Sequence, residues 1–432
     1  MMKHILLGLL AAQTALSTRF VMYIDQYHTK DLPGKNLTEG ITHAVMGFAK
    51  SDLFTSESSP HYEPFEPVST MRDRFSPDTK VLFAIGGWGD TEGFAAGAKD
   101  DTSRQQYAKN VAAVVEENGF DGVDIDWEYP GGNGENYKDI PNEEKTGEID
   151  AFPKLLEAIK KELPEGKILS IATPGKKGDM IAYTDENGPK IAESVDMVNV
   201  MSYDLANRRN NVTKHHSSVE DSRETIKAYK GIGLPAGKLN LGFAYYAKWF
   251  MTAKDADCKA HPLGCEMQEL ETPDGKDTGK SGVLTFEKGT MATPNKDDLK
   301  ESTDGSCGYG TMTTCPEGQC CSQYGTCGTT DAHCQAGCLS DYGTCKGLSI
   351  IDSWRRADKD GQLDEKAGGQ YYFDGEEDLF WTWDTPEMIK RKFKDIVDEE
   401  KIGGVMAWSL GEDTLDFAHV KAMQEGVKER SA

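Results

Sequence analysis

Three carboxylates occupy alternate positions in the run 121–130, which reads DGVDIDWEYP. Alternate residues of a β-strand face the same side, so Asp124, Asp126 and Glu128 would project together from such a strand. The residues between them are apolar and would form the opposite face. Burying three acidic side chains opposes folding unless they are hydrogen-bonded or share protons, so a purely structural role explains them poorly.

Carboxylates crowded in this way cannot all ionise, and their repulsion raises the pKa of at least one of them. A glutamic acid can then stay protonated near neutral pH and donate its proton to a leaving group. The run therefore predicts acid-catalysed bond cleavage, with Glu128 as the general acid.

The elements that must position this run are eight short apolar segments separated by helical patterns. Strand and helix in alternation imply a parallel sheet, and eight strands are the number of a (β/α)8 TIM barrel. Active sites of such barrels open at the C-terminal ends of the strands, which leaves Glu128 nearest the mouth and Asp124 deepest. The segments are 20–24, 44–48, 81–85, 123–127, 168–172, 197–201, 239–243 and 405–408.

The alternation breaks before the last segment, where a polar stretch rich in Gly, Asp, Lys and Thr surrounds a block of cysteines. We interpret this stretch as an insertion before the last strand, because helical spacing returns only near its end. The predicted organisation is a signal peptide at 1–17, the first part of the barrel at 18–250, the insertion at 251–385 with a small module at 307–345, and the last part of the barrel at 386–432.

Charge and the N-terminal residues restrict the partners and the compartment. Lys and Arg number 48 against 72 Asp and Glu, and the net charge of -24 repels nucleic acid. The apolar stretch 5–12 is shorter than the ~20 residues that span a membrane, and the small residues before Thr18 suit a signal peptidase. We expect a secreted, extracellular monomer with sequons at Asn36 and Asn211 and no membrane partner.

Eight of the ten cysteines fall within 307–345, among Gly, Ser and Thr and little apolar material. A segment of this composition cannot fold on a hydrophobic core, so it needs cross-links. Zinc is the alternative, but the segment lacks paired Cys-x-x-Cys hooks and export favours oxidation. We predict disulfides, whose connectivity the sequence alone leaves open.

The carboxylate run resembles the Asp-x-x-Asp-x-Asp-x-Glu signature of glycoside hydrolase family 18, the chitinases and their relatives. The segments 86–88 (GGW) after the third strand and 201–204 (MSYD) after the sixth are also similar to that family. So are Tyr246 after the seventh strand and Trp408 on the eighth.

The resemblance implies hydrolysis of the β-1,4-N-acetylglucosamine linkages of chitin, with retention of configuration and without a cofactor or a metal. In such substrate-assisted hydrolysis the acetamido oxygen of the sugar itself displaces the leaving group. By family analogy Glu128 is the general acid and base, Asp126 accepts the acetamido N–H, and Asp124 shares a proton with Asp126. The hydroxyl of Tyr203 would hold the acetamido carbonyl.

The same resemblance implies a substrate-binding set in which Trp408 forms the floor under the reacting sugar. Trp88 is the least fixed member, because it follows a Gly-Gly turn and could line the cleft or cap the barrel. The other members are Met201, Asp204, Tyr246 and Tyr129.

Two positions depart from the family pattern. Ala84 stands where the family usually has a serine that supports the deepest aspartate, and Lys248 stands where an arginine is common. Lysine keeps the positive charge but lacks the planar guanidinium fork. The missing hydroxyl predicts lowered activity, whereas the acid itself is intact.

The cysteine block is similar to the hevein-like chitin-binding module, above all in the run 320–331, CCSQYGTCGTTD. The resemblance implies a sugar site made of Ser322, Tyr324 and His333, with a thin aromatic platform because Thr326 holds another of the usual aromatic positions. A cross-linked spacer without affinity is the alternative. The implied disulfides are Cys307–Cys321, Cys315–Cys327, Cys320–Cys334 and Cys338–Cys345, with Cys258–Cys265 elsewhere in the insertion.

Three functions fit these residues. The first is a fungal-type chitinase with a tethering module that binds chitin or its oligosaccharides. The second is a chitin-binding lectin or sequestering effector that has lost turnover, which the Ala84 departure keeps open although Glu128 is present. The third is an enzyme that cleaves the chitobiose core of N-linked glycans, and the chitin-binding block argues against it.

Overall fold

The computed structural model describes residues 18–431 except 323, 335–336 and 348. The predicted signal peptide at 1–17 lies outside the described residues. No helix among the residues described is both long and apolar enough to cross a membrane.

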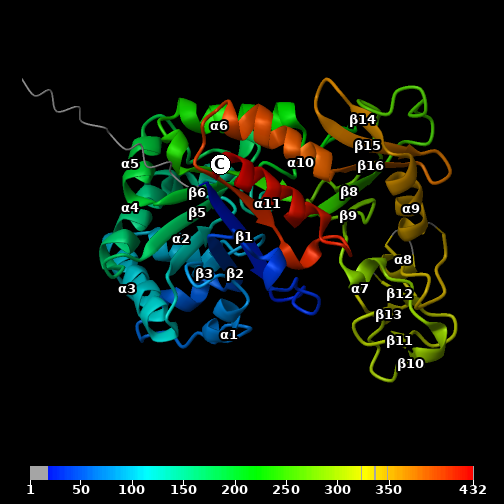
Figure 1. The fold of residues 1–432 in the computed structure, drawn as a ribbon, viewed down its shortest axis with the longest axis horizontal. Coiled ribbons are helices and arrows are strands. Elements are labelled where there is room, and N and C mark those ends of the chain that lie inside the picture. Colours follow the sequence, from blue (N-terminus) through cyan, green and yellow to red (C-terminus); the bar gives the residue numbers. More distant parts are fainter. Residues whose placement is uncertain (1–17, 323, 335–336, 348, 432) are drawn as a thin grey trace, which may run out of the picture.

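Eight parallel strands close into a barrel in the order β1-β17-β7-β6-β5-β4-β3-β2 (Figure 1). Each of them overlaps one of the eight apolar segments, so the predicted (β/α)8 TIM barrel is confirmed. The strands are β1 (Arg19–Asp25), β2 (His43–Ala49), β3 (Lys80–Gly86), β4 (Gly122–Asp126), β5 (Ile168–Thr173), β6 (Met197–Val200), β7 (Leu239–Ala244) and β17 (Gly404–Trp408).

Strand residues alternate between two apolar cores, because successive side chains point to opposite faces of the sheet. Phe20 and Met22 belong to the core between strands and helices, whereas Val21 and Tyr23 belong to the core inside the barrel. The side chains that face the interior of the barrel are therefore the ones from which a site at its mouth is built.

Helices cover the outside of the barrel (Figure 1). The longest, α3 (Asp101–Asn118), begins where the Asp100 side chain accepts a hydrogen bond from Ser103 N and ends at Gly119, whose φ of 71° suits glycine. This helix is one of the helical patterns expected between the strands. The others are α1 (Val68–Asp73), α2 (Glu92–Ala98), α4 (Thr146–Glu162), α5 (Asn187–Ser194), α6 (Val219–Gly231), α10 (Pro386–Lys392) and α11 (Ala418–Ser431).

A second sheet, of order β14-β15-β16-β8-β9, is formed by the chain between β7 and β17. In chain order its first strand is β8, which begins at Tyr246, ahead of the insertion predicted to start at 251. β8 pairs with β16 and β9 rather than with a strand of the barrel. Trp249, Trp354 and Trp381 lie in its separate core. The elements are β8 (Tyr246–Met251), β9 (Ser281–Thr285), α7 (Lys288–Met291), α9 (Ile350–Asp360), β14 (Gln362–Asp364), β15 (Gly369–Asp374) and β16 (Leu379–Trp383).

The cysteine-rich module lies at one end of this second sheet (Figure 1). Its short elements are β11 (Thr313–Thr314), β12 (Cys320–Cys321), β13 (Cys327–Gly328) and α8 (Asp331–Cys334), and β10 (Lys300–Glu301), which precedes the module, pairs with β11. Lys30 Nζ, in the loop after β1, donates to the carbonyl of Gly310 at 2.7 Å, and Leu339 packs against the cores of both the module and the second sheet. The module is therefore packed against its neighbours.

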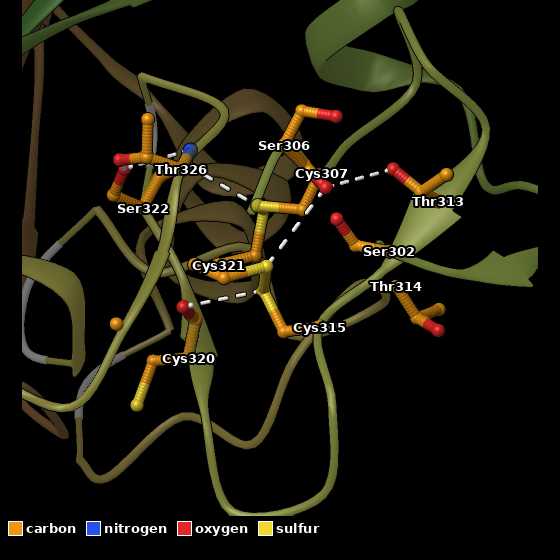
Figure 2. Close-up of a disulfide and its surroundings, with 12 residues drawn as sticks. Ser302, Ser306, Cys307, Thr313, Thr314, Cys315, Cys320, Cys321, Ser322 and Thr326 are labelled. Carbon is orange, nitrogen blue, oxygen red and sulfur yellow. Dashed lines mark hydrogen bonds between the residues drawn. A yellow bond between two sulfur atoms is a disulfide. The ribbon is translucent and has the colours of Figure 1, made fainter. Parts of the chain in front are cut away.

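All ten cysteines of the chain are joined in disulfides. Figure 2 shows the densest part of this network, around Cys307, Cys315 and Cys321. The pairs are Cys258–Cys265, Cys307–Cys321, Cys315–Cys327, Cys320–Cys334 and Cys338–Cys345, the same pairs that the family resemblance implies.

Candidate active site

The three carboxylates lie at the C-terminal end of β4 and line its inward side. Asp124 and Asp126 belong to the strand, whereas Glu128 lies two residues beyond its last residue. The exposed fraction falls from 9% at Glu128 to 4% at Asp126 and 0% at Asp124, which orders the three from the mouth inward. The intervening apolar residues pack outward, where the Trp127 ring stacks on Phe94 with centroids 5.3 Å apart.

Asp124 is held by three donors. Tyr23 Oη donates to its Oδ2 at 2.7 Å, while Ser170 Oγ and Asn199 Nδ2 donate to its Oδ1 at 2.5 and 3.2 Å. Burial raises the pKa of Asp124, and these hydrogen bonds oppose that rise. Ala84 pairs with Asp124 across the β3–β4 register and offers no hydroxyl, so the donor that the family places on β3 is here supplied by Ser170 from β5.

Ser170→Ala is expected to weaken this support of Asp124. Removal of one donor from a buried carboxyl group is expected to cost about 1–3 kcal/mol of stability. It is also expected to lower kcat by about tenfold with little change in KM, because a tenfold loss corresponds to about 1.4 kcal/mol, which lies in the range for one lost hydrogen bond to the carboxyl group that is expected to exchange a proton with Asp126. Thermal unfolding measures the first effect, and steady-state kinetics on a chitin oligosaccharide, the substrate that the family resemblance implies, measure the second.

Ser170→Thr, which keeps a hydroxyl, is the matched control for this variant. Ala84→Ser in the Ser170→Ala background returns a hydroxyl from the neighbouring strand on the other side of β4, and we expect it to recover part of the loss. If Ser170→Ala unfolds and turns over like the unsubstituted protein, Asp124 does not depend on this donor.

Asp126 occupies the centre of the site with unused hydrogen-bonding capacity. Its Oδ1 is buried and has no hydrogen-bond partner among the described residues. Burial raises the pKa of Asp126 well above its ordinary value, and the neighbouring charges of Glu128 and Asp124 add to the rise. A buried oxygen without a partner is costly in a folded protein, so this atom is suited to accept a proton or an N–H from a bound ligand.

Glu128 has the protonation behaviour of a general acid. Burial raises its pKa to about 7; the charges of Asp204 and Asp179 contribute, and a hydrogen bond with Tyr129 opposes the rise. A carboxyl group with this pKa carries a proton for part of the time at neutral pH and can both donate and take up a proton.

Tyr203 lies just beyond the end of β6, the second strand from β4 in the barrel order. Burial raises its pKa well above the ordinary value, so its hydroxyl stays protonated, and the charges of Asp126 and Glu128 add to this effect. The hydroxyl has a weak acceptor, the Met406 sulfur, at 3.8 Å. It is therefore available to donate a stronger hydrogen bond to a ligand.

Asp204 is fixed by residues of the second sheet. Its Oδ1 accepts a hydrogen bond from Tyr246 Oη at 2.9 Å and pairs with Lys248 Nζ at 3.0 Å. Although burial acts to raise its pKa, the charge of Lys248 lowers the pKa of Asp204 overall, so it stays ionised. Lys248 thus contributes its charge through Asp204. Met201, nearby in sequence, is half-buried against the inner core of the barrel.

Two tryptophans lie at or just beyond the C-terminal ends of barrel strands. Trp408, at the end of β17, is half-buried and stacks on Phe48 with centroids 5.4 Å apart. Trp88 is 48% exposed, with its ring edge-on to Tyr129 at 6.4 Å and the Arg209 guanidinium 5.6 Å from its centroid. Such exposure fits a residue at the rim rather than a packed cap.

Sequence reasoning missed the residues that support Asp124. Tyr23, Ser170 and Asn199 come from β1, β5 and β6, and Asn240 on β7 continues the network by donating to Asn199 Oδ1 at 2.8 Å. Each is a polar residue within an otherwise apolar strand segment. That polarity is a usable signal, because a polar residue at an inward position of a barrel strand requires a partner inside the barrel.

Comparison with known proteins places the chain in a family. The family model described as glycosyl hydrolases family 18 matches residues 19–413, so the chain belongs to this family and the resemblance drawn from the carboxylate run is confirmed. Chitotriosidase-1 of Mus musculus is 28% identical over 302 residues, which are 64% of this chain and 63% of that protein. Chitinase 63 of Streptomyces plicatus is 24% identical over 455 residues, covering 95% of this chain and 60% of that protein. The chain thus spans less than two thirds of either relative.

Solved structures share the fold. A chitinase from Rhizomucor miehei superposes with a TM-score of 0.64 at 18% identity, covering 94% of this chain and 99% of that one. A family 18 chitinase of Cycas revoluta, solved in complex with (GlcNAc)4, has a TM-score of 0.61 at 17% identity and the same coverage. At these identities the likeness shows the barrel fold alone.

Proposed function

We propose that the protein is a chitinase that hydrolyses β-1,4-N-acetylglucosamine linkages with retention of configuration. The observation that carries the proposal is the pair formed by Glu128, buried with a pKa of about 7, and Asp126, whose buried Oδ1 lacks a partner. An acid next to an unsatisfied acceptor suits a substrate that needs protonation at one atom and an N–H acceptor at another.

The first chemical step breaks the glycosidic bond. Glu128 transfers its proton to the glycosidic oxygen while the acetamido oxygen of the sugar bonds to C1 and the bond from C1 to the leaving oxygen breaks. The product is a cyclic oxazolinium ion, and Glu128 is left as a carboxylate. Asp126 accepts the acetamido N–H and stabilises the positive charge, and Asp124 exchanges a proton with Asp126.

In the second step Glu128 takes a proton from water, whose oxygen attacks C1 and reopens the ring. The two inversions retain the configuration, and Glu128 regains its proton. Tyr203 donates its hydroxyl hydrogen to the acetamido oxygen, and Trp408 carries the apolar face of the sugar. We assign Met201, Asp204, Tyr246, Trp88 and Tyr129 to the walls of the same cleft.

The proposal is tested by comparing substrates with the full-length protein. We expect release of soluble oligosaccharides from colloidal chitin and from chitin oligomers, and no cleavage of a high-mannose glycoprotein. Activity confined to the glycoprotein would assign the protein to hydrolysis of N-linked glycans instead. Binding of chitin without release of sugar would assign it to the chitin-binding lectins.

The cysteine-rich module is proposed to bind chitin through Tyr324. This ring is 81% exposed, so its face is free to stack on a sugar. Ser322 is only 3% exposed, and its hydroxyl lies 2.8 Å from that of Thr326 (Figure 2). The half-buried His333 has its Nδ1 2.7 Å from Thr330 Oγ1. We therefore assign the main contact to Tyr324, with Ser322 and His333 in supporting positions.

Tyr324→Ala is expected to lower the affinity for insoluble chitin about tenfold, because loss of one stacked ring is expected to cost about 1.4 kcal/mol. Tyr324→Phe keeps the ring and should bind like the parent. Both are measured by depletion on chitin particles in a Glu128→Gln background, which prevents digestion of the matrix. Equal binding by the alanine and phenylalanine variants would show that the module is a spacer.

We also propose that the protein is secreted and acts as a monomer. Five disulfides favour an oxidising compartment, since such bonds are rare in the cytosol. Asn36 and Asn211 are both exposed, as glycosylation requires. The finer assignments, to a fungal-type enzyme with a hevein-like module and with domain boundaries at 251, 307, 345 and 386, belong to the same proposal.

A further inference from the structure

Arg209 lies in the loop after β6 and holds the backbone of a neighbouring loop. That neighbour consists of residues 129–140, which directly follow Glu128, and we call it the acid loop. Arg209 donates from Nη1 to the carbonyl of Asn133 at 2.7 Å and from Nη2 to the carbonyl of Gly134 at 2.9 Å. Because the two donors belong to one planar guanidinium, they fix the direction of the contact as well as its distance. The loops after β4 and β6 are thus joined at the mouth of the barrel.

The same guanidinium packs against two aromatic rings. Its Cζ atom lies 3.9 Å from the centroid of the Tyr137 ring, in the acid loop, and 5.6 Å from the centroid of the Trp88 ring, which follows β3. A guanidinium within about 6 Å of an aromatic face is attracted to the electrons of the ring. Trp88 remains 48% exposed, so Arg209 supports this side chain without enclosing it.

The acid loop lies directly against the backbone of Glu128. A Cβ atom added to Gly134 would lie 2.5 Å from the carbonyl oxygen of Glu128, which is closer than packed atoms can approach, so this contact requires glycine. The carbonyl of Gly134 is one of the two that Arg209 holds. Arg209 therefore restrains the segment that packs against the peptide of Glu128.

Glu271, from the predicted insertion, anchors this arrangement. Its Oε2 accepts a hydrogen bond from Arg208 Nε at 2.8 Å, and its Oε1 accepts one from Tyr137 Oη. The ring that Arg209 contacts and the residue before Arg209 in the chain are thus held by the same carboxylate. This shared anchor restricts where the Arg209 guanidinium can lie.

We propose that Arg209 is a positioning residue for the wall of the cleft that Trp88 and the acid loop form. It orients the Trp88 indole by its charge and holds the acid loop by two carbonyls, so the two parts of the wall keep a fixed separation. The inference rests on the proposed function, in which Trp88 and Tyr129 line the cleft. It adds that the loop after β6 determines how this wall meets a bound sugar chain.

The direct test observes Trp88 by ¹⁹F NMR of protein labelled with 5-fluorotryptophan, with the resonance assigned by its loss in Trp88→Phe. We expect this resonance to shift in Arg209→Ala and to shift less in Arg209→Lys, which keeps a cation beside the ring. Arg223→Ala is the matched control, because Arg223 is also half-buried and donates two hydrogen bonds to one backbone carbonyl, that of Asp395, but lies in α6 on the outside of the barrel. This control should leave the Trp88 resonance in place.

Binding of chitotetraose provides the second readout. It is measured by isothermal titration calorimetry in a Glu128→Gln background, which prevents cleavage during the titration. We expect Arg209→Ala to weaken binding about fivefold, because a Trp88 side chain that is no longer held must be ordered when the sugar binds. Arg209→Lys should recover part of this loss, and Arg223→Ala should bind like the background.

The inference is overturned if folded Arg209→Ala matches Arg223→Ala in either the Trp88 resonance or the affinity. If Arg209→Ala does not fold, Arg209→Lys is compared with Arg223→Lys by the same two criteria. Neither readout requires turnover, so the two proposals fail separately. An unsubstituted protein that binds chitotetraose without cleaving it would refute the proposed hydrolysis, whereas the resonance and the affinity would still decide the role of Arg209.

Discussion

Glu128→Gln is expected to lower kcat on chitin oligosaccharides by at least ~10²-fold while leaving their binding largely intact. The amide has nearly the shape of the carboxylic acid but cannot give up a proton to the glycosidic oxygen or take one from water. Steady-state kinetics on chitotetraose give the loss in kcat, and isothermal titration calorimetry on the variant gives the affinity. Near-parental turnover by Glu128→Gln would remove this residue from the mechanism.

Asp121 provides a control within the same run. It lies at the opposite end of the segment, paired with Arg72 at 2.6 Å and accepting a hydrogen bond from Val81 N at 2.8 Å. Asp121→Asn is therefore expected to reduce thermal stability but to leave kcat close to that of the parent. A loss of kcat as large as that in Glu128→Gln would show that these assays report folding rather than proton transfer.

The pKa of Glu128 also sets the direction of the pH dependence. Because its pKa is raised to about 7, the acid is protonated below that pH and loses its proton above it. The kcat/KM of the unsubstituted protein should accordingly fall as the pH rises through about 7.

Asp126→Asn is the second large expected effect, a loss of ~10²-fold or more in kcat. Asparagine keeps the size of the side chain and an acceptor oxygen but removes the charge that would stabilise the oxazolinium ion. It also ends the proposed exchange of a proton between Asp126 and Asp124, whose charge contributes to the raised pKa of Asp126. The measurement is single-turnover hydrolysis, which isolates bond cleavage from product release.

Ser170→Ala tests the support of Asp124 separately from the chemical roles of Asp126 and Glu128, because it removes a hydrogen bond to Asp124 and leaves the other two side chains unchanged. We expect its loss in kcat to be at least tenfold smaller than that of Asp126→Asn. Equal losses in the two variants would mean that Asp126 acts only by holding the strand in place. A near-parental Asp126→Asn would argue against a charged partner for the oxazolinium ion.

The carboxylates proposed to act in catalysis lie close together in the sequence, which is why the sequence predicts the centre of the site. Asp124, Asp126 and Glu128 belong to one strand and its continuation, so alternation alone places them on one side. The strands of the barrel are buried on both faces and appear as continuous apolar runs, which makes all eight visible.

Contacts between strands could not be predicted in the same way. Ala84 suggested a missing support for Asp124, but the hydroxyl comes from Ser170 on the strand at the other side of β4, and the register that sets Ser170 opposite Asp124 is not visible at either residue. The sequence also does not indicate that Lys248 pairs with Asp204, because Asp204 comes from a different loop. Ser322 was expected to face a sugar, and its burial against Thr326 depends on the turn between them.

The most direct test of the central claim is the anomeric configuration of the first product formed. Proton NMR of chitotetraose hydrolysis, recorded within minutes and before mutarotation, distinguishes the two anomers at the newly formed reducing end. Substrate-assisted hydrolysis by Glu128 and Asp126 predicts that the β-anomer appears first and decays toward equilibrium. Initial release of the α-anomer would mean direct attack by water and would contradict the mechanism.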